Sequence, residues 1–215
     1  MKKITLLSLA IASCTIHLFA QEEVPQTFKR DIGFNTTFIL QGILQSGQTP
    51  FSLMFKKYTA ENSAIRIGAD VFFNLDNTDA YAGSTYYFNT SAASLYLAIG
   101  KEFQKPIDKR WTWYYGGDVV PFVTMNNQDY YQGGNLTSET ENNSAGVSLR
   151  PFLGIRFNLN PRLYLSAEAN IGLQYAYRKN FIQYTGNGEP AVDNSNNNIS
   201  FSMNPASGLF LYYRF

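Results

Sequence analysis

Eight charged residues are the candidates for chemistry in this chain, and all of them fall on one side of a two-residue repeat. They are Lys56, Arg66, Asp70, Glu102, Asp118, Arg150, Arg156 and Glu168. Carboxylates in close pairs suit general acid–base catalysis or an ion path, whereas four basic residues against four acidic ones suit mutual pairing. Because an unpaired charge in a tight interior is costly, the balance favours a structural network. A narrow conducting path and a catalytic carboxylate group are the alternatives.

Thiol and imidazole chemistry are confined to the first 20 residues, because Cys14 and His17 are the single cysteine and the single histidine. The remainder has no thiol nucleophile, no disulfide, no imidazole base and none of the nitrogen and sulfur ligands that zinc or copper favours. Asn- and Asp-rich stretches at 76–79, 126–129 and 193–198 lack the spacing of a calcium loop. We therefore expect no catalytic residue, no cofactor and no metal site.

The amino terminus predicts export. Lys2 and Lys3 precede an apolar run over 4–20, which is too short for a comfortable transmembrane helix and is typical of a signal peptide cleaved after Ala20. A lipidated Cys14 is the alternative, which the apolar residues after it disfavour. Once the two lysines are removed, 15 basic residues face 16 acidic ones. This near-neutrality argues against a nucleic-acid partner.

The rest of the chain alternates with period two. In residues 65–75 every odd position is apolar, and residues 163–177 behave in the same way. Such alternation indicates strands with one face against an apolar medium and the other against polar groups. Turn signals divide the chain into eight predicted strands, at about 31–44, 51–58, 64–75, 92–103, 110–124, 144–157, 162–177 and 198–215.

The connections between these strands alternate in length. Three are short (59–63, 104–109 and 158–161), and three on the other side are long and polar (76–91, 125–143 and 178–197). The first connection on that other side, 45–50, is the exception, because it is short. An even strand number with this asymmetry is the pattern of a transmembrane β-barrel. We therefore predict an all-β, eight-stranded antiparallel up-and-down barrel over 31–215, preceded by a signal peptide over 1–20 and a periplasmic segment over 21–30.

Aromatic residues support this interpretation. They collect near the short turns and near the long connections, as two interfacial girdles would; the residues are Phe103, Trp111, Trp113, Phe157 and Tyr213, and Tyr86, Tyr87, Tyr175 and Tyr177. The chain ends in Phe215 with an alternating last strand. Here it resembles small bacterial outer-membrane barrels of the OmpA/OmpX-like eight-stranded kind. The resemblance implies that Phe215 is a barrel-assembly signal read by the insertion machinery, and that the protein sits in the outer membrane of a Gram-negative bacterium among lipid and lipopolysaccharide.

The competing fold is a soluble periplasmic barrel or sandwich with the apolar face inside. Many polar-side positions hold glycine or alanine, which suits a narrow filled interior better than a soluble surface. Pro121, Pro151 and Pro205 fall inside predicted strands, and we expect bulges or local breaks there because proline cannot donate to the ladder.

The turn at 158–161 predicts which interior residues of its two strands lie opposite each other. If residues whose numbers sum to 318 face each other, Arg150 lies opposite Glu168, within salt-bridge reach. We expect this pair, with Asp70 and Asp118, to form a plug across the barrel. A second layer nearer the short turns would hold Lys56, Arg66, Glu102 and Arg156.

Three functions remain open at this stage. The first is a non-enzymatic barrel that displays loops for structural, adhesive or assembly roles, with Tyr130, Tyr131, Phe181 and Tyr184 as loop residues for an unknown surface ligand. The second is a narrow porin-like channel for small solutes. The third is a lipid-modifying enzyme, which the missing histidine disfavours.

Overall fold

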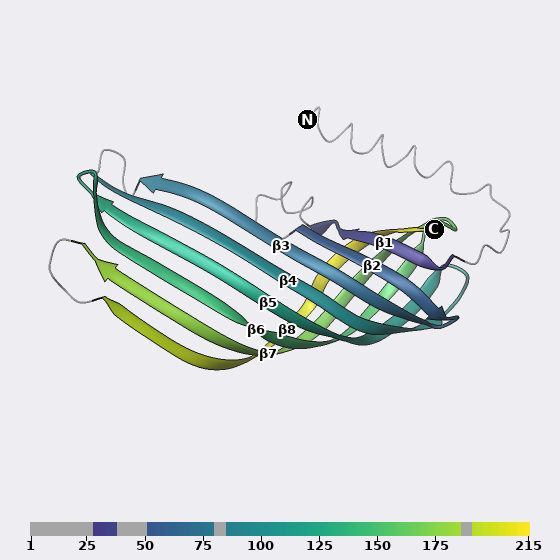
Figure 1. Cartoon of the computed structure of the whole chain (residues 1–215). Helices are drawn as coiled ribbons and strands as arrows, with labels where there is room; N and C mark the ends of the chain where they lie inside the picture. The colour runs from purple at the N-terminus through teal and green to yellow at the C-terminus, as the bar shows by residue number, and fades with distance from the viewer. Residues whose placement is uncertain (1–27, 38–50, 80–84, 186–190) are drawn as a thin grey trace, which may run out of the picture.

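The computed structural model describes residues 28–37, 51–79, 85–185 and 191–215. Within these ranges the chain forms eight strands in sequence order (Figure 1). They are β1 (Arg30–Asn35), β2 (Phe51–Ala60), β3 (Ser63–Asp79), β4 (Tyr86–Pro106), β5 (Trp111–Gln132), β6 (Asn135–Asn158), β7 (Leu163–Tyr184) and β8 (Val192–Arg214). The predicted signal peptide over 1–20, residues 21–27 of the periplasmic segment predicted over 21–30, and residues 38–44 of the first predicted strand lie outside the described residues.

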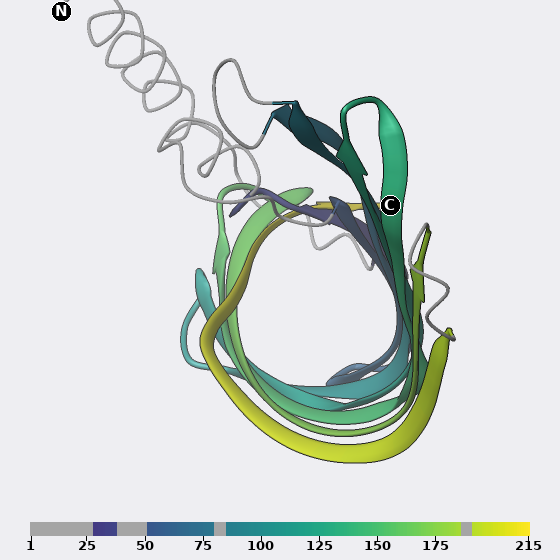
Figure 2. The ribbon, with the colours of Figure 1, turned by 90° about the vertical axis from the view of Figure 1, so that its left-hand side faces the viewer.

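The strands close into one antiparallel barrel in the order β1 to β8. Each strand pairs with its neighbour in sequence, and β1 closes the ring by pairing with β2 on one side and β8 on the other. Figure 2 shows this ring end-on. The predicted eight-stranded up-and-down architecture is confirmed. No helix among the described residues has both the length and the apolar character needed to cross a membrane.

Side chains alternate between the outside and the inside of the ring, as period two requires. On β3, Ile65 and Ile67 point outward, and Ile67 is 51% exposed, whereas Arg66 between them is 2% exposed. Glu168 on β7 is likewise 7% exposed. Apolar residues thus cover the outside and charges fill the inside. Among the described residues, the interior is therefore not the uniformly apolar core that the competing fold requires.

The long polar connections expected at 76–91, 125–143 and 178–197 are mostly strand, so this part of the prediction is wrong. The paired strands β3–β4, β5–β6 and β7–β8 continue through them as hairpins that project from one end of the barrel (Figure 1). Between β5 and β6 the reversal takes two residues, Gly133 and Gly134, with φ of 60° and 85°. Only glycine adopts such angles readily, and the tight turn pairs Gln132 with Asn135 before the register shifts between Tyr130 and Tyr131.

The prolines interrupt pairing as expected. At Pro205 the register of β8 against β7 shifts between the pairs Glu168–Gly208 and Asn170–Asn204. Pairing of β4 with β5 skips the positions beside Pro121, and pairing of β6 with β7 skips those beside Pro151, without a change of register. The missing N–H of proline explains the local breaks.

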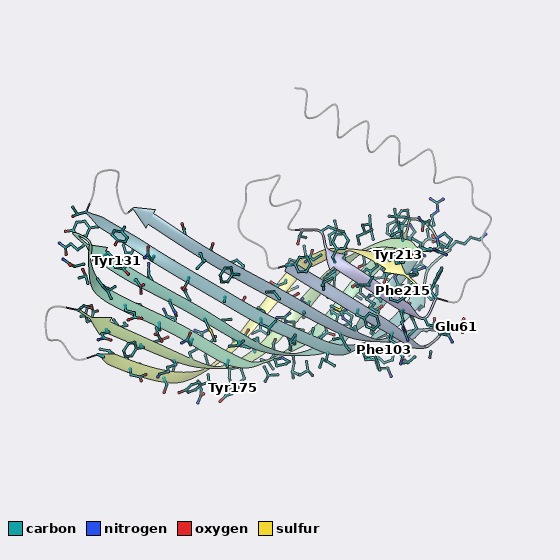
Figure 3. The ribbon with its side chains drawn as sticks, turned by 45° about the horizontal axis from the view of Figure 1, so that its top comes forward. Glu61, Phe103, Tyr131, Tyr175, Tyr213 and Phe215 are labelled. Atoms are coloured by element: carbon teal, nitrogen blue, oxygen red, sulfur yellow. The ribbon has the colours of Figure 1, made fainter. Side chains whose placement is uncertain are left out.

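The aromatic residues divide differently from the two predicted girdles. Phe103, Tyr213 and Phe215 lie together near the short turns, whereas Tyr175 lies part-way along the barrel wall (Figure 3). Tyr87 stacks on Tyr131, with ring centroids 4.5 Å apart, near the tip of the projecting hairpins. Tyr86 and Tyr87 therefore do not share a level with Tyr175 and Tyr177, because β4 extends beyond its predicted start.

Candidate functional site

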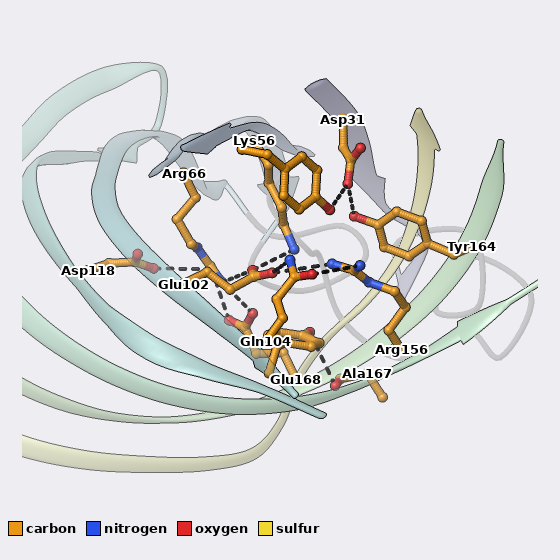
Figure 4. Close-up of polar contacts among 12 residues, drawn as sticks. Asp31, Lys56, Arg66, Glu102, Gln104, Asp118, Arg156, Tyr164, Ala167 and Glu168 are labelled. Carbon is orange, nitrogen blue, oxygen red and sulfur yellow. Dashed lines mark hydrogen bonds and ion pairs between the residues drawn. The ribbon is translucent and has the colours of Figure 1, made fainter. Parts of the chain in front are cut away.

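Arg66 on β3 is the centre of the interior charge network (Figure 4). Its guanidinium donates two hydrogen bonds to Glu168 on β7, Nη1 to Oε2 at 2.8 Å and Nη2 to Oε1 at 3.1 Å. Nη2 also lies 3.1 Å from Oδ2 of Asp118 on β5. One arginine thus ties together three strands across the lumen, in the two-pronged geometry that gives strong carboxylate recognition.

Glu102 on β4 organises the adjoining layer, nearer the short turns, and is fully buried. Its Oε2 lies 2.6 Å from Nζ of Lys56 and 3.7 Å from Arg66. Its Oε1 accepts hydrogen bonds from Gln104 at 2.7 Å and from Arg156 at 3.3 Å. The structure therefore brings together the four residues expected in the second layer, and joins that layer to the first through Arg66.

Aromatic rings complete the wall around these cations. Nζ of Lys56 lies 4.3 Å from the ring centroid of Tyr212 and 4.8 Å from that of Tyr114, and the Arg66 guanidinium carbon lies 3.8 Å from that of Phe152. Rings in these positions attract cations through their negative faces and exclude water. The lumen at this level is therefore packed with side chains.

The predicted partnership of Arg150 with Glu168 is wrong. β6 and β7 pair so that Glu168 faces Gly154, because the turn between them centres on Pro161 and not on residue 159. Asn160 fixes this turn, since its Oδ1 accepts hydrogen bonds from two backbone N–H groups that follow it. Arg150 instead lies 3.7 Å from Asp70, and both side chains are about a quarter exposed (25% and 27%).

Asp31 on β1 belongs to the interior but was missed in the sequence. It is fully buried, and its Oδ2 accepts hydrogen bonds from the hydroxyls of Tyr58 and Tyr164, each at 2.6 Å. Its inward parity follows from the pairing of Asp31 with Lys56. The sequence did contain a hint, because Asp31 is an acidic residue in a segment that was predicted to be a strand. The residues between Asp31 and the next inward position, Lys56, do not alternate continuously, so the inward face could not be traced back to Asp31.

Glycines make room for the network. A Cβ on Gly154 would collide with the ring of Tyr114, and one on Gly100 would collide with the carboxylate of Asp118, which lies over it. By contrast, Gly117 points outward, where the nearest atom to an added Cβ is 3.9 Å away. The inward glycines noted in the sequence therefore allow large side chains to lie across neighbouring strands.

Two cavities flank the network. One of about 210 Å³ lies toward the projecting hairpins and is lined by Asp70, Asp118, Arg150 and Glu168, with Arg66 at its floor. The other, of about 530 Å³, opens among the short turns and is lined by residues that include Arg156. No group of acidic, histidine or cysteine residues in the described part of the chain could hold a metal ion.

The four aromatic residues expected in loops lie on strands. Tyr130 and Tyr131 end β5 and stack against aromatic residues of β4, whereas Phe181 and Tyr184 lie on β7. Phe215 is half exposed, and its backbone exchanges hydrogen bonds of 2.9 and 3.2 Å with Arg30, so the last residue sits on the closing seam.

Six chains among solved structures are similar to this chain. No protein-family model matches the chain, and no curated protein matches its sequence. Among solved structures, the chain is similar to a major outer membrane protein from Thermus thermophilus, with 12% identity and a TM-score of 0.48. The match covers 88% of this chain and 100% of that one.

Proposed function

We propose that this protein is an integral outer-membrane barrel without enzymatic activity, closed by an internal charge plug. The proposal rests on a distribution of side chains that is the reverse of that in a soluble protein. The outward residues of β3 from Ile65 to Leu75 are apolar, and the inward ones are polar or small except Phe72. Ten steps of about 3.3 Å, tilted by about 40°, give a height of about 25 Å. That is the height of the apolar band of outer-membrane barrels.

The plug is the second part of the proposal. Five basic side chains (Lys56, Arg66, Arg150, Arg156 and Arg214) line or fill the lumen against five acidic ones (Asp31, Asp70, Glu102, Asp118 and Glu168). Because these opposite charges neutralise each other in direct contact, the plug has little net charge with which to attract an ion. The projecting hairpins then provide the outer surface for structural, adhesive or assembly contacts, with lipopolysaccharide and the barrel-insertion machinery as the expected partners.

A narrow channel is the second candidate, because cavities reach the network from both ends of the lumen. Single-channel recording on refolded protein in planar bilayers separates the two. We expect no stable conductance steps, and regular steps would favour the channel. Membrane fractionation with a heat-modifiable gel shift tests the location, and a soluble fraction without a shift would contradict it.

A lipid-modifying activity remains the least supported function. The sequence has no histidine after residue 17, and the buried carboxylates of the lumen are already engaged by cations or tyrosine hydroxyls. Incubation with lipid A or phospholipid followed by mass analysis is the test. Any turnover would overturn the assignment as a non-enzyme.

A further inference from the structure

The cavity of about 530 Å³ among the short turns is built from five separate parts of the chain. The segment before β1 contributes Lys29, the end of β2 and the turn after it contribute residues 58–61, and β5 contributes Thr112. Arg156 and Arg214 come from the ends of β6 and β8. We call this cavity the short-turn vestibule. Its walls face the lumen and not the outer apolar surface.

The vestibule carries an excess of positive charge. Lys29, Arg156 and Arg214 line it, against one carboxylate, Glu61, on the exposed turn. Arg214 donates hydrogen bonds to neutral oxygens, at 2.7 Å to Asn158 Oδ1 and 3.5 Å to a backbone carbonyl. Its guanidinium is therefore not neutralised by a carboxylate in direct contact among the described residues.

The carboxylates deeper in the lumen, Asp31 and Glu102, reduce this excess but do not cancel it. Glu102 is shared by Lys56, Arg66 and Arg156, so one negative charge serves three positive ones. Asp31 holds two tyrosine hydroxyls. With Arg66 counted at the opposite cavity, this end of the lumen has one more positive than negative charge among the described residues: Lys29, Lys56, Arg156 and Arg214 against Asp31, Glu61 and Glu102.

Arg156 places a second guanidinium in the wall of the vestibule. The side chain is 4% exposed and lines the vestibule, and its two terminal nitrogens donate to Gln104 and Glu102. Its Nε has no hydrogen-bond partner among the described residues. This Nε is itself buried and the guanidinium lies 4.2 Å from the ring centroid of Tyr164, so Arg156 contributes a fixed positive charge to the wall of the vestibule.

The opposite cavity shows that this charge is not a general property of the lumen. There Asp70, Asp118 and Glu168 face two arginines, Arg66 and Arg150. The interior is thus balanced as a whole but polarised along its axis, acidic toward the projecting hairpins and basic toward the short turns. A small anion would be attracted to one mouth and repelled from the other.

We propose that the short-turn vestibule is a binding site for a small oxyanion, a phosphate or carboxylate group, taken from the aqueous compartment at that end of the barrel. Lys29 supplies an exposed cation at the rim, Arg214 and Arg156 supply cations held in the wall by their neighbours, and Thr112 and Asn158 offer neutral donors. A bidentate hydrogen bond from a guanidinium to the oxyanion is the expected contact.

Titration of refolded protein with inorganic phosphate in a non-ionic detergent, followed by calorimetry, tests the proposal. We expect one saturable site that acetate competes for. Lys29→Gln and Arg214→Gln should each weaken it about tenfold or more, because each removes a charged contact. Lys57→Gln is the matched control, since Lys57 lies at the same level on the outer face of β2 and should leave affinity unchanged.

Retention of the heat-modifiable gel shift establishes that each variant is folded. Absence of saturable phosphate binding by the folded wild type would overturn the proposal. So would an equal loss in Lys57→Gln, which would indicate attraction by net charge alone. Binding of phosphatidylglycerol in mixed micelles without binding of inorganic phosphate would also overturn it. The site would then bind a lipid headgroup from the membrane and not a free oxyanion.

Discussion

Replacement of Arg66 by methionine should be among the most damaging single changes in the lumen. The variant Arg66→Met keeps an unbranched side chain of similar length but removes the one cation that contacts Glu168, Asp118 and Glu102. Three buried carboxylates would then share a dry space with fewer counter-charges. Breaking a buried pair by removing one partner costs about 3–5 kcal/mol. With an m-value of about 3 kcal/mol/M, the urea midpoint would fall by about 1–1.7 M.

The assay is urea unfolding of protein refolded in lipid vesicles, followed by fluorescence of Trp111 and Trp113. Arg150→Met is the matched control, because Arg150 lies 3.7 Å from Asp70 and both side chains are about a quarter exposed (25% and 27%). A pair of that kind contributes about 0–1 kcal/mol. Equal destabilisation by the two substitutions would refute the assignment of Arg66 as the centre of the network.

Three further predictions concern single contacts. Gly154→Ala should lower the free energy of unfolding by about 1–3 kcal/mol through the collision with a tyrosine ring, whereas Gly117→Ala should change it by less than about 0.5 kcal/mol; similar urea midpoints would contradict the packing. Tyr58→Phe should cost about 1.5–3 kcal/mol because it removes a hydrogen bond to a buried carboxylate, and Tyr213→Phe, which loses an exposed contact, should cost less; the reverse order in urea melts would count against the buried carboxylate. Glu168→Ala should weaken folding and raise the conductance measured in planar bilayers, and no change in either quantity would argue against the plug.

The side of the wall on which each residue lies was predictable from the sequence. The alternation in 65–75 fixed that Arg66 and Asp70 share a face, and the same phase placed Lys56 and Glu168 with them. Partners across the lumen were not predictable in this way, because they depend on registers that each turn sets. An error of two residues in the centre of the 158–161 turn was enough to place Arg150 opposite Glu168, where the structure has Gly154.

The projecting hairpins show a different limit. Asn, Ser and Thr in 125–143 were interpreted as loop residues from their composition, yet they form paired strands. Their polar side chains make both faces of each hairpin suited to water, which removes the alternation that marks a half-buried strand. The two-residue reversal at Gly133 and Gly134 was the one local signal of a tight hairpin in this stretch.

The most direct test asks which face of the barrel wall meets hydrocarbon. Because the sequence has no cysteine after residue 14, single-cysteine variants carry one nitroxide each. Labels at Ile99 and Leu149, which are 56% and 51% exposed on the outer face, should be reached by oxygen and not by a water-soluble nickel chelate in vesicles. A label at Tyr131 near the hairpin tip should show the opposite preference. Ready access of the nickel chelate to positions 99 and 149 would contradict the membrane-embedded barrel.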